Sequence, residues 1–279
     1  MAYAYRIDGK KKVRLKDIDA DEDGGLSKEK GEKRLQSLSA QVAELDDLLD
    51  YAGQHALLIV LQGRDTSGKD GTIRHLLTCI NAQSARVETF KVPTAEEMGH
   101  DFLWRAHKKT PAKGELVIFN RSHYEDVIVV RVHGLAPEAV VKQRYQHINA
   151  FERLLHDADT IVLKFFLHIS KQEQEKRLLE REQETEKAWK LSVGDWKERE
   201  LWDEYTEAYE DALGRCSSSE APWFVVPANR KWYRNLAITE QVVEALAPRK
   251  NGWLRSLAAL GKDAKKELAA YRAKRRGKK

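Results

Sequence analysis

Short apolar runs alternate along this chain with longer stretches of helical character. The runs, which are rich in β-branched and aromatic residues, are Ala56 to Leu61, Ala85 to Val92, Glu115 to Asn120, Thr160 to Ile169 and Pro222 to Pro227. They are nearly continuous rather than alternating, which is typical of strands covered on both faces. Helical patterns lie near 69–81, 95–108, 123–131, 137–157, 170–187, 195–214 and 229–246. The alternation predicts an α/β fold with a five-stranded parallel sheet in a three-layer α/β/α sandwich.

The pattern before the first strand predicts an arm followed by a helix. Residues 1–26 are polar, which suggests an extended arm, and Ser27 is a suitable N-cap for a helix that Gly53 ends. The apolar positions of this helix are spaced by three and four and form one stripe: Leu35, Leu38, Val42, Leu45 and Leu49. Neither a repeat nor a Pro- or Ser-rich linker interrupts 27–250, so we expect one domain there and a basic tail over 251–279.

Composition narrows the class of protein. The 279 residues are 42% hydrophobic and 33% charged, enough to bury a core and remain soluble. The longest apolar runs are far shorter than the ~20 residues that span a bilayer, and the first residues lack the apolar segment of a signal peptide. Two cysteines, Cys79 and Cys216, are too few for a disulfide framework. We therefore expect a cytoplasmic protein that does not associate with membranes.

The formal net charge of +5 is concentrated in the tail. Lys262 to Lys279 contain nine basic and two acidic residues, so residues 1–261 carry 40 basic and 42 acidic groups. A solvated basic terminus is commoner than a nucleic-acid site. Nucleic acid is therefore not the expected partner.

A phosphate-binding loop follows the first apolar strand. Gly63 and Gly68 frame four residues, Lys69 comes next, and Gly71 and Thr72 continue into a helix. Glycines let backbone N–H groups turn inward around a phosphate, and the helix directs its positive end at the same point. The alternative is a glycine turn with a surface lysine, but the position between a strand and a helix favours a Walker-type loop.

Two acids distinguish this loop from ATP- and GTP-binding forms. Asp70 stands where those loops have the Ser or Thr that binds Mg²⁺, and Asp65 lies inside the loop. Carboxylates beside phosphates imply a divalent cation between them. The third strand ends in Asn120 rather than in an acid, so the metal-binding acid has moved, and the candidates are Asp65 first, then Asp70, Glu125 and Asp126. The alternatives are that Asp65 stabilises the loop and that Asp70 is a first-turn helix acid.

Several arginines follow the predicted strands. Arg121 comes directly after the third strand, where ligands bind in open parallel sheets, and its planar fork suits phosphate oxygens. Arg105 follows the second strand, and Arg131 lies ten residues beyond Arg121. Both are candidate phosphate contacts, although Arg105 lies in a helix that packing alone explains and Arg131 fits a solvated or interface position equally well.

A helical lid is expected over about 170–200. Arg177 and Arg181 are four residues apart on one helix face, Lys187 and Lys190 follow, and the breaker Ser192 to Gly194 precedes a helix that Asp195 would cap. Cations on a hinged helix favour a lid over an anionic substrate. The alternative is a solvated helix with weak ion pairs.

Four segments together resemble the polyphosphate kinase 2 family. They are GRDTSGKDGTI, FKVPTAEEMGHDFLWR, PAKGELVIFNRSHYEDVIVVRVHG and APWFVVPANRKWYRNLAI, and the resemblance covers roughly residues 30–247. The form FNRSHYEDV looks most like the class III branch, which phosphorylates nucleoside monophosphates as well as diphosphates. The chain departs from the family at Thr66 and Ser67, where two alanines are usual.

The resemblance implies a P-loop kinase fold with a lid and transfer of the terminal phosphoryl group of inorganic polyphosphate to AMP or ADP, with Mg²⁺ or Mn²⁺. It implies that Asp65 holds metal, that Lys69 grips the transferring phosphates, and that Asn120 and Glu125 help to set acceptor choice. By the same resemblance the phosphate contacts are Arg121, Arg177 and Arg181. Adenine or guanine nucleotides are the expected acceptors, and a homo-oligomer (dimer or tetramer) is expected.

Two other functions fit parts of the pattern. An ATP-dependent nucleoside monophosphate kinase would share the sheet, but Asp65 and Asp70 argue against it. A non-catalytic P-loop protein that binds nucleic acid through residues 262–279 is the more distant alternative. The histidines and cysteines lack zinc-site spacing, and no Gly-x-Ser-x-Gly segment suggests acyl transfer.

Overall fold

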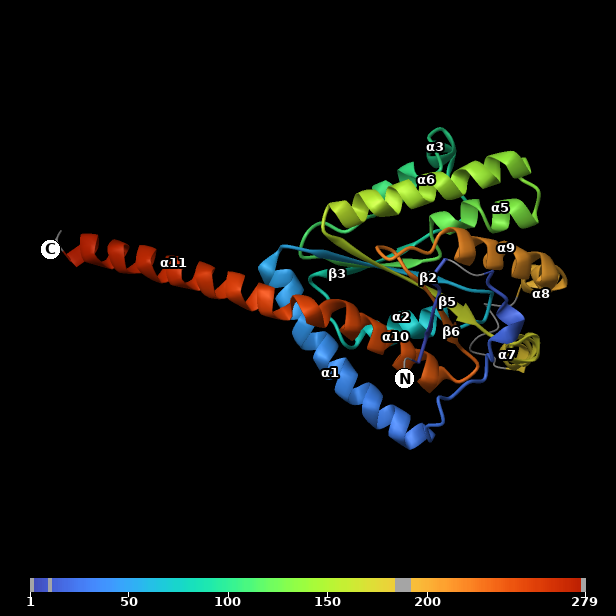
Figure 1. The fold of residues 1–279 in the computed structure, drawn as a ribbon, viewed down its shortest axis with the longest axis horizontal. Coiled ribbons are helices and arrows are strands. Elements are labelled where there is room, and N and C mark those ends of the chain that lie inside the picture. The colour runs from blue at the N-terminus through green and yellow to red at the C-terminus, as the bar shows by residue number, and fades with distance from the viewer. Residues whose placement is uncertain (1–2, 10–11, 184–191, 277–279) are drawn as a thin grey trace.

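A twisted sheet forms the centre of the computed structural model, which describes residues 3–9, 12–183 and 192–276 (Figure 1). The described strands are β1 (Tyr5–Arg6), β2 (Ala56–Gln62), β3 (Ala85–Thr89), β4 (Leu116–Asn120), β5 (Thr160–His168) and β6 (Trp223–Pro227). Their order is β1-β6-β5-β2-β4-β3, with β2 to β6 parallel. The five predicted strands and their direction are confirmed.

The sheet has six strands rather than five because the N-terminal arm adds one. Tyr5 pairs with Val225 and Arg6 with Phe224, antiparallel, and the N–H of Ile7 donates to the carbonyl of Trp223 at 2.9 Å. Two residues in a polar arm carry no alternation that would reveal a strand. The added strand covers the backbone edge of β6, which would otherwise remain unpaired.

Helices cover both faces of the sheet, as predicted (Figure 1). One core cluster joins the sheet to α1 (Lys28–Ala52), α2 (Lys69–Leu77) and α10 (Lys231–Leu246). The other joins it to α4 (Trp104–His107), α6 (Glu138–Asp157) and α9 (Trp202–Arg215). Side chains on each helix stripe meet side chains from one face of the parallel strands, which accounts for the near-continuous apolar runs.

Helix α1 begins and ends where the sequence predicts. The Ser27 side chain accepts a hydrogen bond from the N–H of Lys30 at 3.3 Å, and Gly53 closes the helix at φ 57°. Within the predicted stripe, Leu38, Val42, Leu45 and Leu49 are buried. An N-cap hydroxyl and a left-handed glycine at the C-cap satisfy groups that helix ends leave unpaired.

Three helical predictions differ in detail from the structure. The stretch 95–108 divides into α3 (Ala95–Met98) and α4, and 123–131 divides into η2 (His123–Asp126) and α5 (Val129–Val132). The predicted lid contains α7 (Lys171–Gln183) and α8 (Val193–Glu200), and residues 184–191, including Lys187 and Lys190, lie outside the described residues.

The start of α8 lies two residues before the predicted cap. The Ser192 side chain accepts from the N–H of Gly194 at 3.0 Å and caps the helix, so Asp195 lies in the first turn instead of at the cap. Ser in extended backbone geometry is a preferred N-cap, whereas an acid in the first turn complements the helix dipole.

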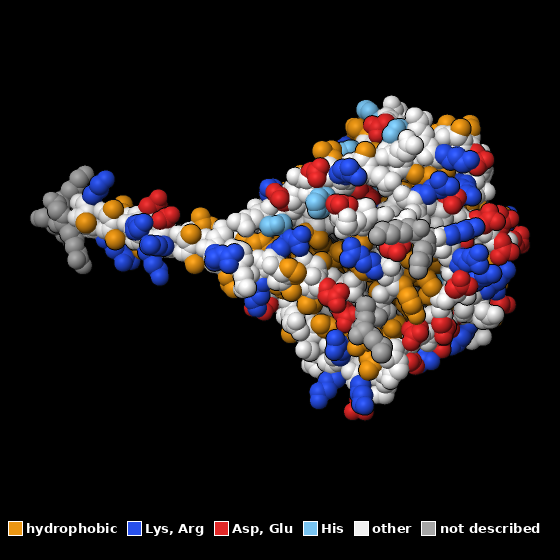
Figure 2. All heavy atoms as spheres, in the orientation of Figure 1, with side chains coloured by type: hydrophobic (Ala, Val, Ile, Leu, Met, Phe, Trp, Pro, Cys, Tyr) orange, Lys and Arg blue, Asp and Glu red, His pale blue; other side chains and the backbone are white. Residues whose placement is uncertain are grey.

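The described part of the predicted C-terminal tail, residues 251–276, is helical. Two short 3₁₀ segments complete the described elements, η1 (Leu15–Asp17) and η4 (Ala247–Arg249), and η4 leads into α11 (Lys250–Arg276). Trp253 anchors the start of α11 in the core, and the rest projects from the body with Lys and Arg along it (Figures 1 and 2). Within the described part of the chain, no helix is both long and apolar enough to cross a membrane.

Candidate active site

The loop from Gly63 to Gly68 connects the carboxyl end of β2 to the start of α2. Gly63 has φ 154° and Gly68 has φ 103°, which are conformations that side-chain-bearing residues rarely adopt. A Cβ on Gly68 would also lie 1.9 Å from Nη1 of Arg234. The two glycines that frame the predicted loop are therefore required by its conformation and by the arginine packed against it.

Thr66 gives the loop a strained residue. It adopts φ 64°, which is unusual for a β-branched side chain. Its carbonyl accepts a hydrogen bond from Nη1 of Arg177 at 2.8 Å, which helps to hold the conformation. Among the described residues, the buried hydroxyls of Thr66 and Ser67 have no hydrogen-bond partner. Thr66 lines the pocket described below, so a phosphate oxygen bound there would supply the missing partner.

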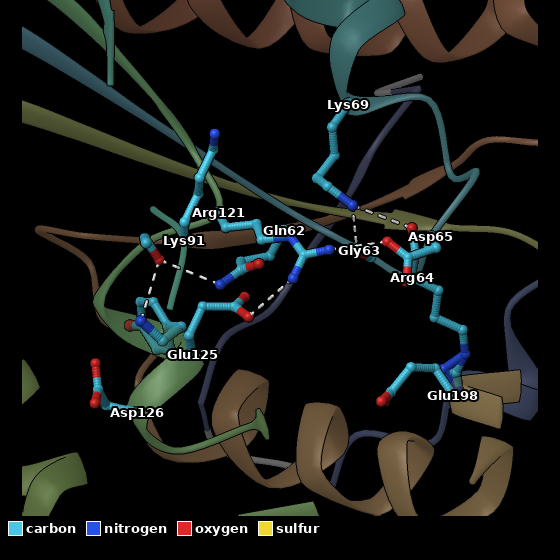
Figure 3. A network of polar contacts seen from close by, with 12 residues as sticks. Gln62, Gly63, Arg64, Asp65, Lys69, Lys91, Arg121, Glu125, Asp126 and Glu198 are labelled. Carbon is cyan, nitrogen blue, oxygen red and sulfur yellow. Dashed lines mark hydrogen bonds and ion pairs between the residues drawn. The ribbon is translucent and has the colours of Figure 1, made fainter. Parts of the chain in front are cut away.

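Lys69 is held across the mouth of the loop (Figure 3). Its Nζ donates to the carbonyls of Gly63 at 2.7 Å and Arg64 at 3.1 Å. Burial lowers the pKa of Lys69, and the neighbouring Asp65 carboxylate opposes that effect. A buried ammonium with only carbonyls as hydrogen-bond acceptors is well placed to bind an anion.

Arg121 joins residues from two strand ends (Figure 3). It adopts φ 60° directly after β4, and its guanidinium donates to Asp65 at 2.9 Å and to Glu125 at 3.5 Å. Burial alone would lower the pKa of Arg121, but Glu125 and Asp65 outweigh it and raise that pKa. Burial raises the pKa of Glu125, and Arg121 opposes the rise. The side chain of Asn120, the last residue of β4, donates to Asp70 at 3.2 Å, so the polar residues at the end of β4 meet the loop region as predicted.

A pocket of about 620 Å³ lies beside the loop and α2. Its wall includes Asp65, Thr66, Gly68, Asp70 and Gly71 of the loop region, together with Asn120. Cations outnumber acids in the lining: the cations are Lys69, Arg74, Lys91, Arg121, Arg177, Arg181, Lys231 and Arg234, and the acids are Asp65, Asp70 and Glu180. Such a lining suits a ligand that carries several negative charges.

The two predicted lid arginines line this pocket but already have partners. Arg177 donates to Glu173 and to the carbonyls of Thr66, Ala228 and Asn229, at 2.7 to 2.8 Å. Arg181 donates to Asp195 at 3.1 Å, which links α7 to α8. Arg177 therefore connects the lid helix to the loop and to the end of β6, a bracing role in addition to its charge.

Three predicted residues lie elsewhere. Arg105 is buried and donates to Asp126 at 3.0 Å and to the carbonyl of Lys91 at 2.9 Å. Asp126 also accepts, through its backbone carbonyl, from Arg144, and Figure 3 shows it apart from Asp65 and Lys69. Arg131 donates to Asp211 on α9 at 2.6 Å. The structure thus brings neither the predicted phosphate contacts Arg105 and Arg131 nor the candidate metal ligand Asp126 into the pocket, because each charge is used in an internal ion pair.

The remaining predicted residue of the loop region, Thr72, supports α2 from within. It is fully buried, and its N–H donates to the carbonyl of Gly68 at 2.9 Å in the first helical turn. It therefore acts on the loop through the backbone and does not line the pocket.

The two carboxylates of the pocket could hold a divalent metal ion together with phosphate oxygens. Asp65 and Asp70 both line the pocket, but no group of three or more His, Cys, Asp or Glu that could hold a metal occurs in the described residues. In phosphoryl-transfer sites Mg²⁺ is bound by one or two carboxylates, with phosphate oxygens and water filling the other positions. Two carboxylates beside a cationic pocket match that pattern.

A buried charge network that the sequence pattern did not predict lies behind the site. Nζ of Lys164 on β5 donates to Glu152, to the Tyr124 hydroxyl at 2.9 Å and to the carbonyl of Cys216 at 2.5 Å. Tyr124 also donates to Glu152 at 2.8 Å, and His123 lies 3.4 Å from the same carboxylate. Burial would raise the pKa of Glu152, but Lys164 outweighs it and the pKa is lowered. The sequence feature that could have indicated this network is Lys164 itself, a charged residue inside an otherwise apolar strand.

This network supports the segment that carries Arg121 and Glu125. His123 and Tyr124 belong to η2, together with Glu125 and Asp126, and η2 begins two residues after Arg121. Arg64 was also not predicted as part of this region. Its guanidinium carbon lies 3.7 Å from the centre of the Trp202 ring, and burial lowers the pKa of Arg64 to about 10. It ties the loop to α9.

The fold and the site together define a P-loop phosphotransferase: a phosphate loop at the carboxyl edge of a parallel sheet opens on a cationic pocket with two carboxylates. The chain belongs to the polyphosphate kinase 2 family, whose model matches residues 25–252. The resemblance stated from the sequence is thereby confirmed.

Relatives and a solved structure agree with this assignment. The chain is 49% identical over 244 residues to the AMP/ADP-polyphosphate phosphotransferase of Meiothermus ruber, covering 87% of this chain and 91% of that protein. It is 42% identical over 232 residues to the ADP-polyphosphate phosphotransferase of Rhodopseudomonas palustris, covering 79% and 80%. The crystal structure of Polyphosphate Kinase 2 from Arthrobacter aurescens TC1 superposes with a TM-score of 0.82 at 41% identity, covering 85% of this chain and 86% of that one.

Proposed function

We propose that this enzyme transfers the terminal phosphoryl group of inorganic polyphosphate to AMP and ADP. The observation that carries the proposal is the pocket, in which Lys and Arg outnumber acids around a phosphate loop that has Asp70 in place of Ser or Thr. A linear polyanion offers no base to recognise, so its binding depends on rows of cations. The names of the similar phosphotransferases support the same donor.

Phosphoryl transfer needs positioning and charge neutralisation more than covalent chemistry. Lys69 and the backbone N–H groups of the loop would hold the donor end, and Arg121 would neutralise charge on the transferring group from the opposite strand. The acceptor phosphate attacks in line, and the shortened polyphosphate leaves with the electrons of the broken P–O bond. A covalent enzyme intermediate is not required.

The metal proposed for this site is Mg²⁺ or Mn²⁺. Asp65 and Asp70 would hold it, since both carboxylates line the pocket next to Lys69. When bound, it supplies positive charge to the phosphate oxygens and offsets their repulsion from those carboxylates. Arg121 keeps the Asp65 carboxylate in place through its 2.9 Å hydrogen bond.

Acceptor choice is assigned to residues at the end of β4 and in the turn that follows it. Asn120 donates to Asp70 and Glu125 accepts from Arg121, and these contacts beside the loop support a role for both residues in positioning the acceptor. The sequence FNRSHYEDV resembles the class III branch, and the Meiothermus relative is named for both AMP and ADP. We therefore propose both acceptors, and the assay would include the guanine nucleotides GMP and GDP.

Cytoplasmic location and assembly into a homo-oligomer stay predictions. Free AMP and ADP are the proposed acceptors, which favours a compartment rich in nucleotides. Gel filtration with light scattering would measure the oligomeric state directly.

The experiment combines purified enzyme, Mg²⁺, AMP and long-chain polyphosphate without ATP, followed by ³¹P NMR. Growth of ADP and ATP signals as the polymer shortens would support the proposal. Turnover when ADP replaces AMP, but none with AMP, would restrict the acceptors to diphosphates. No turnover with either acceptor, together with AMP phosphorylation when ATP is added, would instead favour an ATP-dependent monophosphate kinase.

A further inference from the structure

Arg234 is a buried cation at the wall of the pocket. It lies in the first turn of α10, is 3% exposed, and lines the pocket. Its Nε and Nη2 donate to the side chain of Asn235 at 3.1 and 2.9 Å. Within the described part of the chain, no carboxylate acts on its charge. Hydrogen bonds to a neutral amide do not compensate for the free energy that burying a guanidinium costs.

A second cation, Arg177, makes the position of Arg234 less favourable. Burial and, after it, the positive charge of Arg177 together lower the pKa of Arg234 to about 10. Arg177 has a carboxylate partner in Glu173 and donates to three backbone carbonyls. Of these two cations, Glu173 neutralises the charge of Arg177 only. The charge of Arg234 therefore leaves an excess of positive charge at the wall of the pocket.

The phosphate loop is shaped around this guanidinium. A Cβ on Gly68 would lie 1.9 Å from Nη1 of Arg234, and a Cβ on Gly71 would lie 3.1 Å from Nη2. Both glycines belong to the start of α2, where backbone N–H groups point out of the helix. The guanidinium and the positive end of the helix therefore meet at one point beside Lys69.

We propose that Arg234 binds the polyphosphate donor, forming with the start of α2 a subsite for a phosphoryl group of the chain. The inference rests on the proposed function for the identity of the anion. An arginine fork can donate to two phosphate oxygens at once, whereas an ammonium donates as a point charge. The competing explanation is that Arg234 only braces α2 against α10.

The test compares Arg234→Met and Arg234→Lys with the wild type, using Arg249→Met as the matched control. Arg249 lies beyond the other end of α10, is half-buried, and has its pKa lowered by burial without a carboxylate partner among the described residues. We expect Arg234→Met to raise the KM for polyphosphate at least tenfold while the KM for ADP changes less than threefold. Arg234→Lys should fall between it and the wild type, and Arg249→Met should match the wild type.

Thermal unfolding gives a readout that does not depend on turnover. We expect wild-type Tm to rise with added inorganic tripolyphosphate, and Arg234→Met to lose most of that rise. Without ligand, the Tm of Arg234→Met should equal or exceed that of the wild type, because the substitution removes an uncompensated buried charge. If Arg234→Met does not fold, Arg234→Lys decides the question through the same two measurements.

A double-mutant cycle tests whether Gly71 acts through Arg234. Gly71→Ala should raise the KM for polyphosphate in the wild-type background and have little effect in Arg234→Met, because the displaced group is then absent. Unchanged donor KM and unchanged tripolyphosphate protection in the Arg234 variants would overturn the proposal. Wild-type turnover with ATP but not with polyphosphate would refute the proposed function separately, and tripolyphosphate protection would still report on Arg234.

Discussion

The buried pair of Lys164 and Glu152 gives the sharpest stability prediction. Lys164→Met would leave the Glu152 carboxyl buried, with hydrogen bonds from Tyr124 and His123 but without the ammonium. An isolated carboxylate in such a site takes up a proton rather than remain charged. The substitution should therefore invert the sign of the Glu152 pKa shift, from lowered to raised.

The loss of folding free energy in Lys164→Met depends on the pH. The ordinary pKa of Glu152 is 4.5. Keeping the carboxyl neutral in the folded variant costs about 1.36 kcal/mol for each pH unit above that value, or about 3.4 kcal/mol at pH 7 and under about 1 kcal/mol at pH 5. In the wild type the lowered pKa has the opposite consequence: its stabilisation is complete above pH 4.5 and is lost as the pH falls through the folded pKa.

Guanidinium chloride unfolding at pH 5, 6, 7 and 8 would measure this difference. The free energy of unfolding of Lys164→Met should fall increasingly below that of the wild type as the pH rises. A second variant, Lys164→Met with Glu152→Leu, removes both charges and should recover most of the loss at pH 7. A difference that does not change with pH, or one below about 1 kcal/mol at pH 7, would refute the reasoning.

Three further predictions concern the site and the tail. Lys69→Ala should abolish turnover while circular dichroism stays unchanged, and activity within a few-fold of the wild type would exclude the role given to its ammonium. Asp65→Asn should lose activity that added Mn²⁺ restores only in part, and an unchanged metal dependence would move the metal to Asp70. Removal of residues 262–279 should leave kcat and KM within about twofold of the wild type, since the described part of that segment is exposed; a collapse of turnover would place the tail in the donor channel.

The parts of the site that a single continuous segment forms could be predicted from the sequence. The loop from Gly63 to Lys69 is contiguous, so its glycines, its lysine and its place between a strand and a helix could all be predicted. The meeting of Arg121 with Asp65 was also predictable, because adjacent parallel strands bring their carboxyl ends to one edge of a sheet.

Tertiary packing decided the rest. Arg105 and Asp126 carry the residue types expected of a phosphate contact and a metal ligand, yet the turn after β4 brings Asp126 to Arg105 on α4. Arg234 reaches the loop from a helix more than 160 residues further along the chain, and nothing local to it indicates which way α10 faces. The strand β1 is two residues long and exists because the edge of β6 offers it partners.

Direct transfer from polyphosphate is the central claim, and terminal labelling tests it most directly. The enzyme would be given polyphosphate carrying ³²P in its terminal phosphoryl group, with unlabelled AMP, Mg²⁺ and no ATP, and stopped within the first turnovers. The account predicts label in the β-phosphate of ADP and very little in inorganic phosphate. Label released as inorganic phosphate, or transfer that occurs only when ATP is supplied, would contradict it.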